Sequence, residues 1–180
     1  MNFIVFDLEA TCWNGHQISE TQEIIEIGAV LVNNYGEIEK NFSEFVQPYV
    51  NPTLSAFCRE LTTISQRDVD RARLFPEVIE EFKDWINILQ HDYVLCSWGK
   101  FDKKMLINDC LLHNCEFDWI EQHMNIKKQY AQVRNLKKPI GLRWAIEKED
   151  FEFEGTQHRA IYDALNTAKI FARYLDEWSY

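Results

Sequence analysis

A short apolar run near the N-terminus, residues 3–6, is followed at once by two acidic residues, Asp7 and Glu9. Four bulky apolar residues in a row are typical of a strand that is buried on both faces. Because side chains alternate along a strand, Asp7 and Glu9 should project from the same face. Two adjacent carboxylates beside a core repel each other and are costly to desolvate, and a cation usually holds such a pair together. The sequence therefore predicts a buried first strand that ends at a cation site, with two solvated acids in a loop as the simpler alternative.

Hydrophobic periodicity and turn residues predict an α/β fold for the chain as a whole. Strands are expected at residues 2–8, 23–33, 37–46 and 93–98. Helices are expected to begin near Pro76, Phe101, residue 140 and Arg159, and residues 119–131 are ambiguous and helical in part. A leading hairpin followed by alternating helices and strands favours a mixed sheet. Since no repeat and no linker rich in Pro, Gly or Ser interrupts the chain, residues 1–180 are interpreted as a single domain.

Composition argues against several classes of protein. No apolar stretch approaches the ~20 residues that span a bilayer, and we see no signal peptide before the first strand. The five cysteines lack the spacing of a disulfide framework, which favours reduced thiols and a cytoplasmic location. A net charge of −10 argues against non-specific binding to nucleic acid. The exception is residues 127–143, which hold six basic residues and no acid and form either a phosphate-facing surface or a solvated basic face.

Three further residues, Asp102, His158 and Asp163, are candidates to join the two acids of the first strand. Asp102 follows the strand expected at residues 93–98, and strand ends are where α/β folds place ligands. Taken alone, it is more simply an acid that complements a helix dipole. On a regular helix His158 and Asp163 would point ~140° apart, so they converge only if His158 lies in the loop before the helix. The alternative is a surface histidine beside an ion pair of Asp163 with Arg159.

A second group of possible metal ligands lies in the middle of the chain. Cys110, His113 and Cys115 are donors that zinc accepts. The group lacks a fourth ligand at the usual spacing and straddles the end of an expected helix. Zinc binding is therefore disfavoured.

Three segments of the chain together resemble the motifs of a known enzyme family. They are Phe6-Asp7-Leu8-Glu9-Ala10-Thr11, then Phe101-Asp102, and then His158-Arg159-Ala160-Ile161-Tyr162-Asp163 with the residues that follow it. They resemble the three exonuclease motifs of the DEDDh 3′→5′ exonucleases, with all four acids and the histidine present in order. Residues 51–72 are similar to the enhanced-RNAi and histone-mRNA 3′-exonuclease subfamily, which includes small bacterial members. The SAP domain of the animal relatives has no counterpart in this sequence, so we do not expect their particular RNA targets to apply.

This resemblance implies an RNase H-like fold, with a mixed five-stranded sheet and helices on both faces, and a two-metal phosphodiesterase site. Asp7, Glu9 and Asp163 would hold one Mg²⁺ or Mn²⁺. Asp7 would share the second ion with Asp102, directly or through water. Hard divalent ions bind carboxylate oxygens, and two ions ~4 Å apart clamp the attacking and leaving oxygens of a displacement. His158 would complete the catalytic set as the general base that deprotonates the attacking water, and the nearby acids should raise its pKa.

The resemblance also implies how a substrate is held and cut. Backbone groups of Ala10 and Thr11 would hold the terminal 3′-hydroxyl, and Phe101 would stack on the terminal base unless it is a core aromatic of its helix. The partners would be 3′ ends of single-stranded nucleic acid, RNA rather than DNA, and the products nucleoside 5′-monophosphates. Two alternatives stay open: a DNA-directed exonuclease of the repair or proofreading type, and a non-catalytic nucleic-acid-binding module on the same fold.

Overall fold

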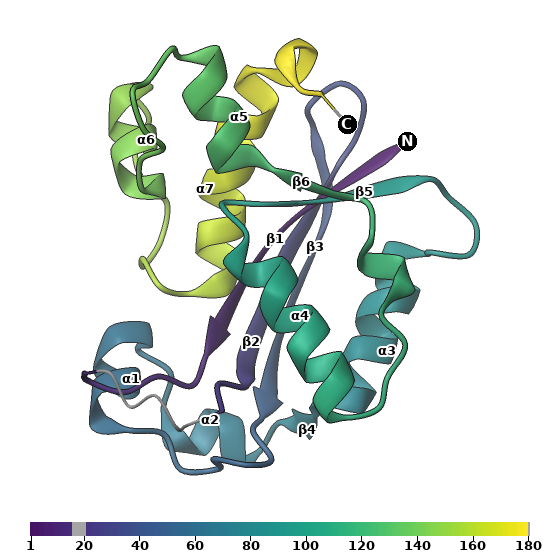
Figure 1. Ribbon diagram of the computed structural model, residues 1–180, viewed down its shortest axis with the longest axis vertical. Helices are drawn as coiled ribbons and strands as arrows, with labels where there is room; N and C mark the ends of the chain where they lie inside the picture. Colours follow the sequence, from purple (N-terminus) through teal and green to yellow (C-terminus); the bar gives the residue numbers. More distant parts are fainter. Residues whose placement is uncertain (16–20, 180) are drawn as a thin grey trace.

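A computed structural model describes residues 1–15 and 21–179, and at its centre lies a six-stranded mixed sheet (Figure 1). The strands are β1 (Asn2–Ala10), β2 (Ile24–Val32), β3 (Ile38–Gln47), β4 (Arg73–Leu74), β5 (Tyr93–Ser97) and β6 (His123–Asn125). Their order across the sheet is β4-β3-β2-β1-β5-β6. Central strand β1 is antiparallel to β2 and parallel to β5. The expected α/β class and mixed sheet are confirmed, whereas the expected number of five strands is wrong.

The strands and helices that the sequence did not predict are short. Strand β6 lies in the segment that was ambiguous, and β4 forms only by parallel pairing with the end of β3. A strand of two or three residues is too short to show alternation, so only its tertiary partner reveals it. Two short helices between β3 and β4, α1 (Ala56–Thr62) and α2 (Gln66–Asp70), were not predicted either.

The remaining helices cover both faces of the sheet (Figure 1). They are α3 (Phe75–Ile86), α4 (Phe101–Leu112), α5 (Ile126–Val133), α6 (Leu142–Lys148) and α7 (Ala160–Arg173), with short 3₁₀ turns at Asp118–Ile120 and Leu175–Glu177. Helices α3 and α4 pack on one face, and α5, α6 and α7 pack on the other. Within the described part of the chain, no helix is both long and apolar enough to cross a bilayer.

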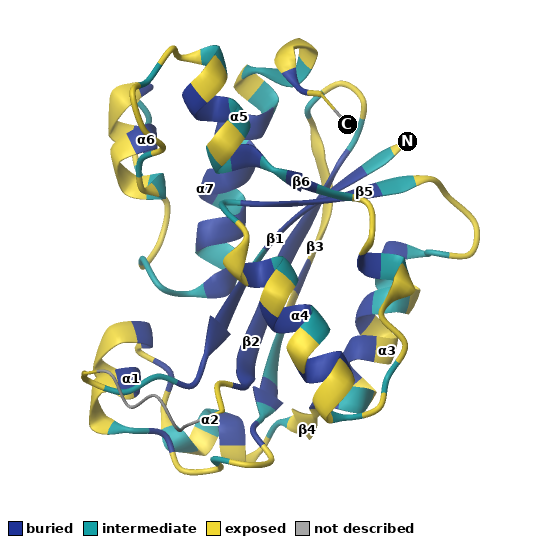
Figure 2. Ribbon diagram, in the orientation of Figure 1, coloured by how far each residue is buried: buried dark blue, intermediate teal, exposed yellow. Residues whose placement is uncertain are grey.

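Strand β1 divides its side chains between the two cores, as the period of a strand requires. Ile4 and Phe6 face the core under α3 and α4. Phe3 and Val5 face the core under α5, α6 and α7. The burial colours of Figure 2 show this central strand enclosed along most of its length. Because the odd-numbered residues face α7, the next two of them, Asp7 and Glu9, are directed toward the face that α7 covers.

Gly28 lets the N-terminal end of α7 lie directly on strand β2. Gly28 pairs with Asp7 across the β1–β2 ladder. A Cβ at position 28 would overlap the backbone of Ala160 and Ile161, so only glycine permits this approach. The contact brings the first turn of α7 next to the acids of β1.

Candidate active site

The structure brings four acidic side chains together at one end of the sheet. Asp7 and Glu9 come from β1, Asp102 from the first turn of α4, and Asp163 from the first turn of α7. Burial, and after it the charges of Asp102, Asp163 and Glu9, raise the pKa of Asp7 well above its usual value. The four carboxyl groups are therefore close enough to act on one another's protonation.

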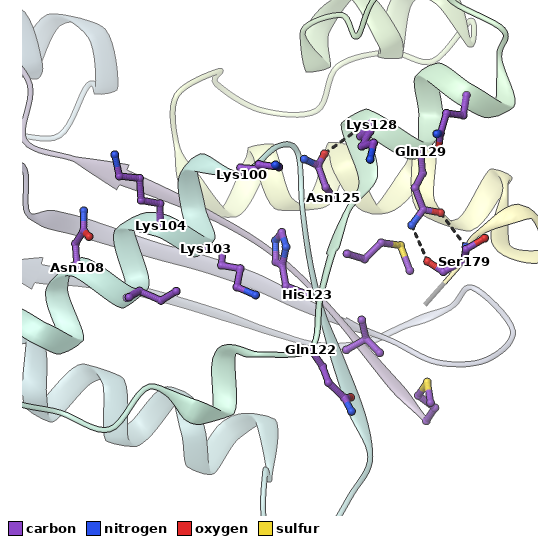
Figure 3. A pocket seen from close by; sticks show the side chains of 15 residues that line it. Lys100, Lys103, Lys104, Asn108, Gln122, His123, Asn125, Lys128, Gln129 and Ser179 are labelled. Carbon is purple, nitrogen blue, oxygen red and sulfur yellow. Dashed lines mark hydrogen bonds between the residues drawn. The ribbon is translucent and has the colours of Figure 1, made fainter.

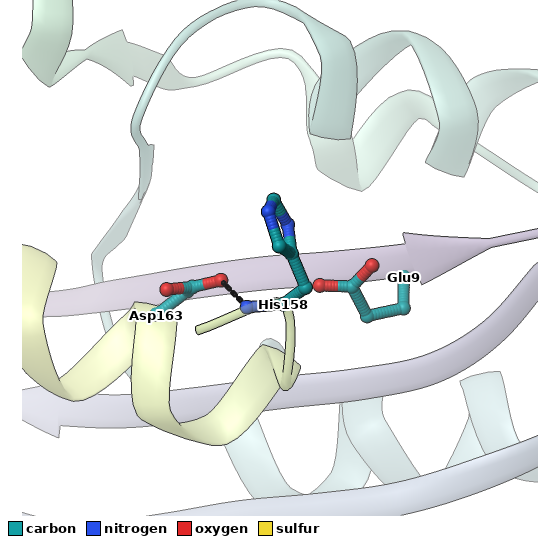
Figure 4. Close-up of side chains that lie close together, drawn as sticks. All are labelled: Glu9, His158 and Asp163. Atoms are coloured by element: carbon teal, nitrogen blue, oxygen red, sulfur yellow. Dashed lines mark hydrogen bonds between the residues drawn. The ribbon is translucent and has the colours of Figure 1, made fainter. Parts of the chain in front are cut away.

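His158 joins this group from the loop before α7 (Figure 4). One ligand atom each of Glu9, His158 and Asp163 lies within 4.8 Å of the other two. Helix α7 begins at Ala160, and His158 has a left-handed backbone with a φ of 62°. Its backbone N–H donates to Oδ2 of Asp163 at 2.9 Å. The predicted convergence of His158 and Asp163 through a loop is therefore confirmed, and it depends on a turn that most residues adopt only with strain.

The loop is tied to α7 by a side chain that sequence reasoning did not single out. Asn166 accepts from the backbone N–H of Glu154 at 2.9 Å and donates to its carbonyl oxygen at 2.9 Å. Gly155, with a φ of 70°, turns the chain against the ring of Tyr162. These contacts fold residues 154–158 back onto the first turns of α7.

Glu26 is a second residue that the sequence analysis missed. It lies on β2 opposite Glu9, is 1% exposed, and accepts from Nη2 of Arg159 at 2.8 Å. It also accepts from the backbone N–H of Ala160 at 2.9 Å. The alternative ion pair of Asp163 with Arg159 is wrong, because Arg159 pairs with Glu26 instead. A single acid in the apolar run Ile24-Ile25-Glu26-Ile27 was the available signal.

Burial and mutual repulsion disfavour the charged forms of these acids. Burial, followed by neighbouring carboxylates, raises the pKa of Glu9 to about 9. Burial raises the pKa of Asp163 to about 7, and that of Asp102 to about 6 although a hydrogen bond from Ser97 opposes the shift. A divalent cation would reverse this preference, since metal binding requires deprotonated ligands and compensates their charge. An all-carboxylate donor set is also the one that hard ions such as Mg²⁺ and Mn²⁺ select, so the residues fit such ions.

The pKa of His158 departs from our expectation. Burial lowers it, whereas the nearby acids were expected to raise it. Loss of hydration disfavours the imidazolium, and Glu9, with a pKa near 9, carries little charge at neutral pH to stabilise it. The expected direction is therefore wrong for the metal-free site, and His158 is neutral there at pH 7.

The residues expected to hold the substrate lie at the edge of this group. Ala10 and Thr11 are buried at the end of β1, and the backbone N–H of Thr11 donates to the carbonyl of Glu23 at 2.8 Å. The contact of Ala10 and Thr11 with a 3′-hydroxyl stays a prediction. Phe101, beside Asp102, is 46% exposed, so it is not a core aromatic. Its stacking on a base also stays a prediction.

The second group of possible metal ligands, Cys110, His113 and Cys115, does not form a set of three neighbouring ligand atoms. Among the described residues, Glu9, His158 and Asp163 are the only set of three or more such side chains with ligand atoms all within 4.8 Å of one another. Cys110 is buried in the core under α3 and α4. His113 stacks on Phe75 at 5.4 Å between ring centroids.

Comparisons with known proteins agree with this geometry. The family model described as Exonuclease (RNase_T) matches residues 4–171. The chain is similar to 3'-5' exoribonuclease 1 of Homo sapiens, with 33% identity over 96% of this chain and 52% of that protein. It is similar to ERI1 exoribonuclease 2 of Xenopus laevis, with 33% identity over 96% of this chain and 28% of that protein. The chain thus spans about half, or less, of the length of these curated relatives.

A solved structure shows the same fold. The nuclease domain of 3'hExo, a DEDDh family member, bound to rAMP, superposes with a TM-score of 0.91. The sequences are 33% identical, and the match covers 98% of this chain and 92% of that one. The expected RNase H-like fold is therefore confirmed.

Proposed function

The chain belongs to the exonuclease family whose model matches residues 4–171, and on that premise we propose that it is a metal-dependent 3′→5′ exonuclease. The observation that carries the proposal is the convergence of four carboxyl groups and one histidine from β1, α4 and the start of α7. Its substrate is the 3′ end of single-stranded RNA, and its products are nucleoside 5′-monophosphates. RNA is favoured over DNA because the relatives are named exoribonucleases and the similar structure holds rAMP.

We assign two Mg²⁺ or Mn²⁺ ions to the acids. Asp7, Glu9 and Asp163 hold one ion, and Asp7 shares the other with Asp102. When bound, the ions supply positive charge to the attacking and leaving oxygens. Support for this assignment is the raised pKa of each acid, as expected where a group of carboxylates needs cations to keep its negative charge.

His158 accepts the proton of the attacking water in this proposal. Its ring is half-buried and neutral, which is the form that a general base requires. The hydrogen bond from its backbone to Asp163 fixes the base and one metal-binding acid in the same turn. Ala10 and Thr11 are assigned to the 3′-hydroxyl and Phe101 to the terminal base, where stacking tolerates any sequence.

We further propose that residues 1–180 form one domain that works in the cytoplasm. The five cysteines are free in this structure, which suits a reducing compartment.

The direct test is a degradation assay with 3′-labelled and 5′-labelled single-stranded RNA and DNA, in Mg²⁺, Mn²⁺ or EDTA. We expect release of mononucleotides from the 3′ label, a descending ladder from the 5′ label, and no reaction in EDTA. Internal fragments would refute an exonuclease, and full activity in EDTA would refute the metal mechanism. Faster loss of DNA than of RNA would assign the enzyme to DNA. Asp7→Asn is the control, because it removes one charge from both proposed ion sites.

A further inference from the structure

A basic groove lies between α4, β6 and α5, outside the group of acids (Figure 3). Its volume is about 1070 Å³. Four lysines line it, three from the start of α4 and one from α5: Lys100, Lys103, Lys104 and Lys128. No acidic residue of the described chain lines it. We call this feature the lysine groove.

The charges of the lysine groove have no carboxylate partner within the described residues. Lys100, Lys104 and Lys128 are exposed, and Lys103 donates to the backbone carbonyl of Glu121 at 3.0 Å. Four unpaired cations in one hollow repel one another, and in a chain of net charge −10 acids were available to pair with them. Their concentration on one surface therefore indicates a polyanionic ligand.

The neutral lining of the groove suits phosphates and sugars. Asn108, Gln122 and Gln132 contribute amide groups, which are common donors to phosphate and sugar oxygens. Strand β6 forms the edge of the sheet and pairs only with β5 among the described strands. The groove thus combines cations, amide donors and one open strand edge.

The start of α4 and two hydrogen bonds link the lysine groove to the group of acids. Lys100 is two residues from Asp102 in the sequence. His123, whose ring stands in the groove in Figure 3, is hydrogen-bonded to Oγ of Ser97 at 2.9 Å. Ser97 in turn hydrogen-bonds to Asp102. A strand whose 3′ end lies at the acids therefore has a basic surface next to it along α4.

We propose that the lysine groove binds the phosphodiester backbone of the RNA strand on the 5′ side of the nucleotide that is removed. This inference rests on the proposed function, because it assigns the rest of the same substrate. Lysines on opposite walls, from α4 and α5, contact successive phosphates without reading bases, which suits an exonuclease that must advance along any sequence.

The test compares two double variants in the Asp7→Asn background with EDTA, so that the RNA stays intact. Lys104→Gln/Lys128→Gln removes one exposed lysine from each wall. Lys40→Gln/Lys148→Gln removes two exposed lysines that do not line the groove. Fluorescence anisotropy measures binding of RNAs of about three and about fifteen nucleotides, spanning the range of single-strand site sizes.

We expect the groove variant to lose affinity for the long RNA and little for the short one. The slope of log affinity against log salt should become shallower by about 1.4, or about 0.7 for each lost phosphate contact. A fourfold rise in salt should then weaken the parent's binding about sevenfold more than the variant's. The control double variant should match the parent. Equal behaviour of the two double variants with the long RNA, or equal losses for both RNAs, would overturn the inference.

Two additional measurements separate this inference from its rivals and from the proposed function. Poly-glutamate that displaces the long RNA more strongly than unlabelled RNA does would assign the groove to an acidic protein and overturn the inference. Hydrolysis of the p-nitrophenyl ester of a nucleoside monophosphate by the wild type in Mn²⁺ reports on the acids and His158 without the lysine groove. If this ester and RNA both resist hydrolysis while the groove variant still loses affinity for long RNA, the proposed catalysis fails and the groove stands as an RNA-binding surface.

Discussion

Glu9→Gln should stabilise the metal-free protein at neutral pH. The folded state raises the pKa of Glu9 from 4.5 to about 9, because the buried carboxylate lies among other acids. A group with a raised pKa favours folding fully below its unfolded pKa, and this contribution is lost as pH rises toward the folded pKa. Wild-type stability should therefore fall between about pH 4.5 and pH 9.

The size of the effect at pH 7 follows from the interval over which the unfolded chain is ionised and the folded one is not. That interval runs from pH 4.5 to pH 7. At about 1.4 kcal/mol for each pH unit, the buried Glu9 lowers the free energy of unfolding of the wild type by about 3 kcal/mol at pH 7. The substituted amide would have no charge to neutralise, so the variant should recover up to about 3 kcal/mol and melt up to about 10 °C higher in EDTA. With Mn²⁺ the wild type should melt at a higher temperature than Glu9→Gln, because ligand binding stabilises only the protein that keeps its metal ligands.

Thermal unfolding in EDTA and in Mn²⁺, at pH 5 and pH 8, tests two predictions. One is the fall of wild-type stability with pH, and the other is the change in which protein melts higher when Mn²⁺ is added. Glu60→Gln is the matched control, since Glu60 is exposed on α1, and it should leave the melting temperature unchanged in every condition. A Glu9→Gln variant that melts below the wild type in EDTA at pH 8 would refute the reasoning. The same holds for a wild type whose stability does not fall from pH 5 to pH 8.

Three further predictions concern the acids and their support. His158→Ala should slow single-turnover cleavage by orders of magnitude yet keep Mn²⁺ affinity in calorimetry; lost affinity would make the histidine a ligand. Asp163→Asn keeps an acceptor for the His158 backbone, so turnover should fall by orders of magnitude with an unchanged circular dichroism spectrum; near wild-type turnover contradicts the assignment. Gly28→Ala should cost about 3 kcal/mol or more in urea unfolding, because the new Cβ overlaps the Ile161 backbone. Gly141→Ala, which meets only ordinary contacts, is its control, and equal costs would refute the overlap.

Much of the site could be predicted because it follows from the regular spacing of side chains along strands and helices. Strand alternation places Asp7 and Glu9 on one face, and the angular step of a helix requires His158 to precede α7. The motifs led to the DEDDh exonucleases, and the family match confirms that resemblance. These inferences need only local geometry, which the sequence carries directly.

The supports of the site could not be predicted, because they depend on contacts between distant segments. No residue next to Glu26 in the sequence indicates that it pairs with Arg159. The need for glycine at position 28 becomes clear only from the contact of α7 with β2. The lowered pKa of His158 likewise reflects burial, which the motif does not encode. The lysine groove joins residues 100–104 to Lys128 through a strand, β6, too short to recognise from its sequence.

The pairing of Glu26 with Arg159 bears on when during synthesis the candidate site can be assembled. The two residues are 133 positions apart, and α7 is the last long helix of the described chain. A nascent chain that has completed β1 and β2 holds Asp7 and Glu9, but it lacks Asp163 and His158 until α7 has left the ribosome and docked. Domains generally fold as units, with distant contacts formed late. A growing chain that ends before α7 therefore lacks two of the five residues of the proposed active site, and the site can be completed only after α7 has docked.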